Sequence, residues 1–288
     1  MILEEQYILS NGIEIPKIGL GTWFISNETV AQAVKDAVEM GYRHIDTAQA
    51  YQNENGVGEG VRNCGVKRAD IFVTTKLAAE VKHYQEAVTS IEGSLKALGL
   101  DYIDLMLIHS PKPWAKFHES EPYFEGNREA WRALEEAYRA GKLRAIGLSN
   151  FKNEDIANIL ESCSVQPMVN QVLAHIGNTP QELIQYCQDT DLLVEAYSPI
   201  GHGALLKNRP VIEMAAKYKV SVPQLGIRYD LQLGLLPLPK TANPVHMRAN
   251  AEVDFIITDE DMTVLKNIKQ KAYGEAERFP VFSGGNKG

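Results

Sequence analysis

Residues 84–110 read YQEAVTSIEGSLKALGLDYIDLMLIHS, and this stretch contains one full unit of the pattern that decides the fold. Apolar residues recur at helical spacing over residues 84–98, and Gly99 is the kind of residue that commonly ends a helix. The apolar run of residues 103–108 predicts a strand, and the polar residue His109 follows it directly. The unit is therefore a helix, a short loop and a strand with a polar group at its carboxyl end.

The same alternation recurs along the whole chain. Strand candidates lie at residues 18–20, 44–46, 71–73, 103–108, 145–148, 168–169, 192–194 and 235–238. Helical patterns occupy residues 28–40, 54–63, 84–98, 128–140, 153–161 and 181–188, with two more between 211 and 233. Because no linker interrupts these β-α units, they predict one α/β domain over residues 1–288, a (β/α)8 TIM barrel. Ahead of it, Asn11-Gly12 predicts an N-terminal β-hairpin with a type I′ turn.

Composition and charge narrow the class of protein. Of the 288 residues, 44% are hydrophobic and 23% charged, as in an ordinary globular protein. A formal net charge of -8 argues against a nucleic-acid partner, which would need a basic face. Cys64, Cys163 and Cys187 lack metal-ligand spacing, which favours a reduced, cytoplasmic protein without a metal site. The sequence shows neither a signal peptide nor a membrane-length apolar run, so we expect no membrane role. We also expect a monomer, with a weak dimer as the alternative.

Polar side chains follow most of the predicted strands. They are Asp46, Lys76, His109, Ser149, Asn150, Gln171, Tyr197, Ser198, Lys240 and Thr241. In barrels of this type the catalytic groups lie at the carboxyl ends of several strands, so the fold would gather these residues at one face. The pattern therefore predicts a single site built from distant parts of the chain.

Four of the candidate residues carry a family resemblance. Asp46, Tyr51, Lys76 and His109 match in kind, order and spacing the catalytic tetrad of the aldo-keto reductase family. The resemblance covers nearly the whole chain and includes residues 19–23 (GLGTW), 41–48 (GYRHIDTA), 98–104 (LGLDYID), 147–151 (GLSNF), 170–171 (NQ), 196–199 (AYSP) and 239–241 (PKT). In style the chain resembles bacterial members related to diketogluconate reductases. The resemblance implies reduction of a small-molecule aldehyde or ketone by hydride transfer from NADPH.

The resemblance also implies a role for each member of the tetrad. Hydride addition to a carbonyl builds negative charge on its oxygen, so the site needs a proton donor there. Tyr51 would be that donor, Lys76 would lower the Tyr51 pKa, and Asp46 would hold Lys76 charged. His109 would orient the carbonyl oxygen. Taken singly, Asp46 also fits a structural ion pair and His109 an ordinary loop residue.

The cofactor positions follow from the same resemblance, since the chain has no GxGxxG motif. They are Gly21, Thr22, Trp23, Ser149, Asn150, Gln171, Tyr197, Ser198, Pro199, Ile200, Gly201, Leu205, Lys240, Thr241, His246 and Asn250. Ser149, Asn150 and Gln171 would bind the carboxamide, and Tyr197 would stack on the nicotinamide ring. Lys240 and Thr241, ahead of a helix that starts at Pro244, would bind the adenosine phosphate.

Two regions depart from the family pattern. Six residues after the lysine the family usually has an arginine, but this chain has His246, with Arg248 two residues later. A neutral histidine cannot make the bidentate contact of an arginine, so NADH is the alternative to NADPH.

In the substrate pocket, Ala78 and Ser110 replace tryptophans found in many members. We therefore expect a wider, less aromatic pocket bounded by Trp23, Phe24 and Trp114, and lightly closed by residues 279–288.

Two other functions remain open at this point. The first is a non-catalytic, nicotinamide-nucleotide-binding regulatory subunit on the same fold, against which the intact tetrad counts. The second is a metal-dependent barrel hydrolase. Its strand ends would need several His, Asp or Glu ligands, and most strand ends here carry other residues.

Overall fold

The computed structural model describes residues 1–270 and 272–283, and within them eight parallel strands form one sheet. The strands are β3 (Leu20–Gly21), β4 (His44–Asp46), β5 (Phe72–Leu77), β6 (Ile103–Ile108), β7 (Leu143–Ser149), β8 (Val169–Leu173), β9 (Leu193–Tyr197) and β10 (Leu236–Leu238). Each pairs with the next, and a parallel bridge between Gly21 and Lys240 joins the first to the last. The sheet therefore closes into the predicted (β/α)8 barrel.

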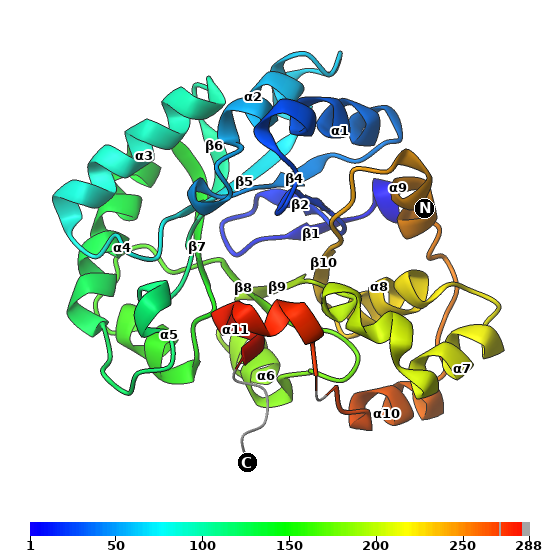
Figure 1. The fold of residues 1–288 in the computed structure, drawn as a ribbon. Coiled ribbons are helices and arrows are strands. Elements are labelled where there is room, and N and C mark those ends of the chain that lie inside the picture. Colours follow the sequence, from blue (N-terminus) through cyan, green and yellow to red (C-terminus); the bar gives the residue numbers. More distant parts are fainter. Residues whose placement is uncertain (271, 284–288) are drawn as a thin grey trace.

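Helices follow one another around the outside of the strands, except that the last one lies at the carboxyl end of the barrel (Figure 1). They are α1 (Asn27–Glu39), α2 (Glu54–Arg62), α3 (Tyr84–Leu98), α4 (Phe124–Arg139), α5 (Asn153–Leu160), α6 (Gln181–Asp189), α7 (Arg209–Lys217), α8 (Val222–Gln232), α9 (Pro244–Ala251), α10 (Asp259–Asn267) and α11 (Pro280–Ser283). Local side-chain and backbone chemistry determines where two of these helices begin or end. Gly99 ends α3 in the left-handed conformation (φ 62°), and the Ser221 hydroxyl accepts a hydrogen bond from the Gln224 backbone N–H at the start of α8.

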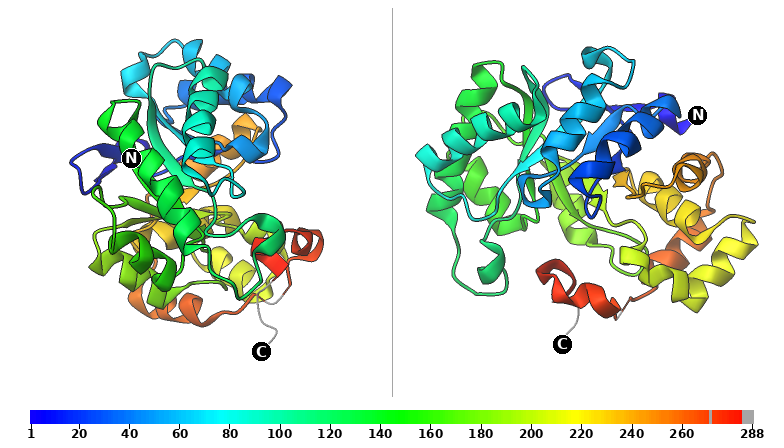
Figure 2. Two further views of the ribbon diagram at one scale, coloured as in Figure 1. Left: turned by 90° about the vertical axis from the view of Figure 1, so that its left-hand side faces the viewer. Right: turned by 45° about the horizontal axis from the view of Figure 1, so that its top comes forward.

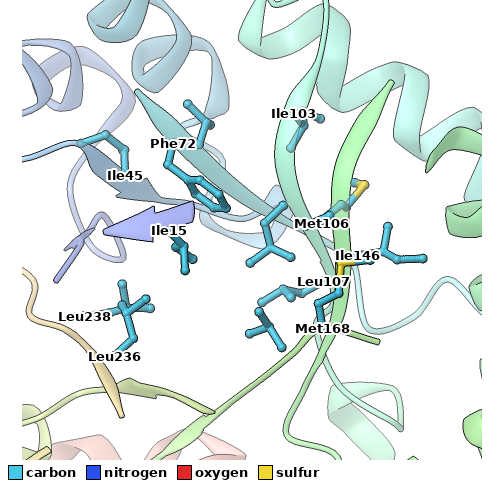
Figure 3. Packing of buried hydrophobic residues seen from close by; sticks show 14 of the residues in the cluster. Ile15, Ile45, Phe72, Ile103, Met106, Leu107, Ile146, Met168, Leu236 and Leu238 are labelled. Atoms are coloured by element: carbon cyan, nitrogen blue, oxygen red, sulfur yellow. The ribbon is translucent and has the colours of Figure 1, made fainter. Parts of the chain in front are cut away.

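The strands and the helices around them share one continuous cluster of buried apolar side chains. Every residue of β5 and β6 is buried, and apolar side chains of the strands belong to this cluster of buried residues, part of which Figure 3 shows. Ile15, fully buried, joins this core from the N-terminal hairpin of β1 (Gln6–Ile8) and β2 (Glu14–Pro16). The Tyr7 hydroxyl donates to the Leu235 carbonyl, just before β10 begins. The hairpin therefore covers the amino end of the barrel, opposite α11 in the left view of Figure 2.

The hairpin turn differs from the prediction. A type I′ turn needs positive φ at both central residues, but only Gly12 (φ 84°) has it here. The Gly12 N–H donates to the Leu9 carbonyl, and the Leu9 N–H donates to the Ile13 carbonyl. The loop is thus one residue longer than the two-residue turn, and the predicted turn type is wrong.

Several strands reach further toward their carboxyl ends than the apolar runs suggested. Lys76 pairs with Leu107, and Gln171 pairs with Glu195, inside regular parallel ladders. Polar side chains in a strand are compatible with the ladder because backbone pairing does not depend on the side chain. Lys76, Gln171 and Tyr197 therefore lie within strands β5, β8 and β9 and not after them.

Beyond the last barrel strand, α10 and α11 were not predicted from the sequence. Of the helices that the structure describes, none combines the length and apolar character needed to cross a bilayer.

Candidate active site

The carboxyl ends of the strands surround a cavity of about 830 Å³. This size falls in the usual range of small-molecule and cofactor sites, roughly 300–1,000 Å³. Most residues predicted for the site line it. They are Gly21, Trp23, Asp46, Tyr51, His109, Trp114, Ser149, Asn150, Gln171, Tyr197, Ser198, Pro199, Ile200, Lys240, Thr241, His246 and Asn250. The barrel therefore brings together positions that lie far apart in the sequence.

Other predicted residues lie outside the cavity wall. They are Thr22, Phe24, Lys76, Ala78, Ser110, Gly201 and Leu205. Thr22 is buried, and its hydroxyl donates to the Asp46 backbone carbonyl (2.9 Å). Phe24 is 51% exposed, and Leu205 belongs to a separate cluster of buried side chains. Lys76 lies behind Asp46, so it contacts the site through that carboxylate and through Tyr51.

A buried ion pair forms the floor of the site. Lys76 Nζ lies 2.6 Å from Asp46 Oδ1, and both side chains are almost fully buried. The same ammonium donates to the Thr47 carbonyl (2.8 Å) and to the Tyr51 hydroxyl (3.4 Å). An ammonium has three donor hydrogens, so these acceptors satisfy it completely. Strands β4 and β5 are neighbours, which places the two charges side by side.

Tyr51 stands above this pair on a short turn of 3-10 helix, Gln49–Tyr51, that follows β4. Its ring centre lies 4.9 Å from Lys76 Nζ and 5.7 Å from the His109 ring centre. Burial raises the pKa of Tyr51 well above 10, and the Asp46 carboxylate raises it further. The predicted lowering of this pKa is therefore wrong, because burial, and after it the Asp46 carboxylate, favour the protonated phenol.

The backbone N–H and the backbone carbonyl of His109 are both hydrogen-bonded. Its N–H donates to the Leu77 carbonyl (3.1 Å), and its carbonyl accepts from Asn150 Nδ2 (3.0 Å). Burial, and then the charge of Lys76, lower the pKa of His109 well below its usual value. The ring is thus neutral at physiological pH, and among the described residues its Nδ1 has no hydrogen-bond partner.

A network of polar side chains lies beside the tetrad, on β7 to β9. The Tyr197 hydroxyl donates to Asn150 Oδ1 (2.7 Å), and Asn150 Nδ2 donates to the Ser149 hydroxyl (3.1 Å). Asn150 (φ 62°) and Ser198 (φ 53°) both take the left-handed conformation, which non-glycine residues adopt rarely and which recurs at functional sites. The network fixes hydrogen-bonding groups along one wall of the cavity.

Glu195 belongs to this region but was missed from the sequence. It is fully buried, and its Oε2 accepts from Gln171 Nε2 (2.6 Å). Burial raises its pKa to about 8, with a further contribution from the Asp46 charge. The available signal was a single acidic residue inside the apolar run of residues 192–197.

The far end of the cavity suits an anion. Lys240 and Thr241 line it just before α9, and the Asn243 side chain caps that helix by accepting from the Val245 N–H (2.9 Å). Backbone N–H groups at a helix start, together with a lysine, favour phosphate. His246 lines this part of the cavity.

Arg248 does not line the cavity. It lines a separate hollow between α1 and α9 with Asp36 and Glu39. Successive residues of a helix point in directions about 100° apart, which turns Arg248 away from the face that carries His246. His246, and not Arg248, therefore lines the cavity.

The near end of the cavity has an aromatic wall that includes the predicted residues Trp23 and Trp114. His202 stacks on Trp23 (ring centres 5.4 Å apart), and Phe279 meets Trp23 edge-on (4.9 Å). Trp114 packs edge-on against His109 (5.1 Å). The aromatic groups thus come from loops and the C-terminal segment, whereas Ala78 and Ser110 do not contribute. Of the tail predicted to close the pocket, Phe279, Pro280 and Val281 line the cavity, and residues 284–288 lie outside the described residues.

Further residues line the cavity without having been predicted as site residues. They are Ala50, His202, Gly203, Leu206, Ser221, Pro223, Ile227, Leu238, Pro239 and Ala249. Most are apolar or lie on loops, so nothing in the local sequence distinguished them from packing residues. In the described ranges, no group of three or more His, Cys, Asp or Glu side chains could bind a metal ion.

Comparison with known proteins agrees with this geometry. The model of the Aldo/keto reductase family matches residues 17–270. The glyoxal reductase of Bacillus subtilis (strain 168) is 40% identical over 262 residues, covering 90% of this chain and 91% of that protein. The D-galacturonate reductase of Hypocrea jecorina is 34% identical, covering 94% and 93% of the two chains.

Solved structures give the same result. An aldo/keto reductase from Brucella melitensis superposes with a TM-score of 0.85 at 35% identity, over 92% of this chain and 98% of that one. The Bombyx mori aldo-keto reductase in complex with NADP superposes with a TM-score of 0.82 at 33% identity, over 95% and 96%. The barrel, the cavity and these relatives agree: the chain is an oxidoreductase that belongs to the aldo/keto reductase family.

Proposed function

We propose that this enzyme reduces small aldehydes or ketones to alcohols, with NADPH as the hydride donor and Tyr51 as the proton donor. One observation carries the proposal. The Tyr51 hydroxyl contacts the Lys76 ammonium, which pairs with Asp46, and Tyr51 shares a cavity with His109. This combination supplies a proton and a polar partner for one carbonyl oxygen.

The reaction uses each group in a defined way. Bound NADPH supplies a hydride to the carbonyl carbon. Because burial raises its pKa, Tyr51 keeps its proton at neutral pH and has it available for the carbonyl oxygen. His109, being neutral, hydrogen-bonds that oxygen and orients it. Lys76 lies close enough to stabilise the phenolate that remains after the proton has left Tyr51.

The residues of the cavity fit the cofactor. Ser149, Asn150 and Gln171 offer hydrogen-bonding groups for a carboxamide, and the Tyr197 ring lines the same wall. Lys240 and the start of α9 suit the adenosine phosphate. The Bombyx mori relative contains NADP, which favours NADPH for this chain. His246 in place of an arginine leaves NADH as the second donor to test.

The direct test is consumption of NADPH, followed by its absorbance, with methylglyoxal and 4-nitrobenzaldehyde as substrates. We expect turnover with at least one carbonyl compound and release of the corresponding alcohol. Binding of NADPH without turnover across a broad carbonyl panel would instead identify a non-catalytic, nucleotide-binding subunit.

We further propose that residues 1–288 act as one domain, as a monomer, in a reducing compartment such as the cytoplasm. All three cysteines lie in the described part of the chain, and none forms a disulfide. This agrees with a reducing environment.

A further inference from the structure

Glu195 is an acidic side chain enclosed by the barrel, and the reaction proposed above does not use it. It lies on β9, directly beside Gln171 of the neighbouring strand β8 in the parallel register. Its exposure is 0%, and it does not line the cavity. Any effect on the reaction must therefore pass through the residues that Glu195 touches.

The contact that matters is with Gln171. Gln171 Nε2 lies 2.6 Å from Glu195 Oε2 and 2.9 Å from Asp46 Oδ2. An amide NH₂ group has two hydrogens, so it can donate to both acids at once. Within the described residues, Gln171 Oε1 has no hydrogen-bond partner, and Gln171 lines the cavity. The two acids therefore turn the amide nitrogen inward and leave the amide oxygen facing the cavity.

We propose that Glu195 is a positioning residue: it holds the Gln171 amide so that Oε1 accepts a hydrogen bond from the nicotinamide carboxamide. This inference rests on the proposed function. A glutamine with Asp46 as its only partner keeps more freedom to rotate. The second acceptor on Glu195 removes that freedom before the cofactor arrives, which lowers the entropy cost of binding.

The energetic cost of Glu195 supports a functional role. A buried carboxyl group without an ammonium or guanidinium of its own loses the hydration it has in the unfolded chain. Burial and the nearby Asp46 charge raise its pKa to about 8, and its Oε1 has no hydrogen-bond partner among the described residues. Replacing buried charged groups by well-packed apolar residues often leaves the folded protein as stable as before or makes it more stable. Stability alone therefore does not account for an acid here.

Two variants of Glu195 separate positioning from packing. Glu195→Leu removes the acceptor, whereas Glu195→Gln keeps an oxygen that can accept from Gln171. Binding is measured by calorimetry with NADPH and with 2′,5′-ADP, which carries the adenosine end without the nicotinamide. NADPH is chosen over NADP⁺ because its ring is uncharged, so a difference in charge between the variants at residue 195 acts on it weakly.

We expect Glu195→Leu to weaken NADPH binding about 10-fold, the effect of roughly one hydrogen bond, with 2′,5′-ADP affected less than about twofold. Glu195→Gln should stay within about twofold of the wild type for both ligands. Adding Gln171→Ala to Glu195→Leu should cause no further loss beyond that of Gln171→Ala alone, because both changes remove the same contact. Thermal melting checks that each variant folds.

Three results would overturn the inference: unchanged NADPH affinity in Glu195→Leu, equal weakening of both ligands, or additive losses in the double variant. A wild-type chain that binds neither ligand would overturn the proposed function as well. If only the proposal for Glu195 is wrong, the wild type still binds NADPH and turns over carbonyl substrates. The two failures are therefore distinguishable.

Discussion

The Lys76 ammonium lies 3.4 Å from the Tyr51 hydroxyl and 4.9 Å from the centre of its ring. The positive charge therefore lies next to the Tyr51 hydroxyl, the group from which a proton would leave. Asp46 holds the ammonium from the other side at 2.6 Å. This arrangement makes the three residues one unit.

Tyr51→Phe removes only the hydroxyl. We expect turnover to fall by roughly 10²–10⁴-fold, as for loss of a general acid, with NADPH affinity nearly unchanged. Steady-state kinetics and calorimetry measure the two effects. Tyr186→Phe, on the outer helix α6, is the matched control and should keep full activity. Near-normal turnover in Tyr51→Phe would reject Tyr51 as the proton donor.

Lys76→Met leaves the Asp46 carboxylate buried without its partner. We expect the free energy of unfolding to fall by roughly 3–5 kcal/mol, measured by urea denaturation. The double variant Lys76→Met/Asp46→Leu, which removes both charges, should recover part of this loss. If the double variant is no more stable than Lys76→Met, an uncompensated charge is not the cause.

Glu195→Gln tests the pH dependence of stability. The ordinary pKa of 4.5 rises to about 8 in the folded protein, so the folded chain keeps a proton that the unfolded chain has released. Between these pH values the wild type therefore loses stability as the pH rises. Besides burial, the groups that act on Glu195 are Asp46, which raises its pKa, and Gln171 and Lys76, which lower it.

Glu195→Gln lacks this titration. Relative to the wild type it should gain on the order of 3 kcal/mol between pH 4.5 and pH 7, measured by denaturation at each pH. Parallel stability curves for the two proteins over this range would show that Glu195 has an ordinary pKa.

His246→Arg places a guanidinium where the cavity suits the 2′-phosphate. We expect the ratio of kcat/KM for NADPH to that for NADH to rise about 10-fold, because arginine binds phosphate in a bidentate, charge-assisted manner. Arg248→Ala is the control and should leave the ratio unchanged, since Arg248 lines the hollow with Asp36 and Glu39. An unaltered ratio in His246→Arg would remove His246 from the phosphate site.

Phe279→Ala opens the aromatic wall beside Trp23. We expect kcat/KM for 4-nitrobenzaldehyde to fall roughly 3–10-fold, the value of one aromatic contact, while methylglyoxal is less affected. A substrate panel with fixed NADPH measures the difference. Equal losses for both aldehydes would indicate a general distortion of the site in place of a lost aromatic contact.

The sequence alone determined the barrel and most of the polar site. Alternating apolar runs and helical periods depend on local spacing, so they predicted every barrel strand and most helices. Parallel strands in a barrel end at one face, and this rule predicted that Asp46, His109, Gln171 and Lys240 lie together there. Each of these inferences needs only the order of residues along the chain.

Only the tertiary structure decided which side chains meet and how their environment changes them. Glu195 contacts Gln171 across two strands, and His202 and Phe279 reach Trp23 from distant segments. The rise in the Tyr51 pKa depends on burial and on the distance to Asp46, neither of which a sequence contains. Local spacing specifies the strands and helices, whereas desolvation and charge interactions depend on positions in space, and these arise only when the barrel closes.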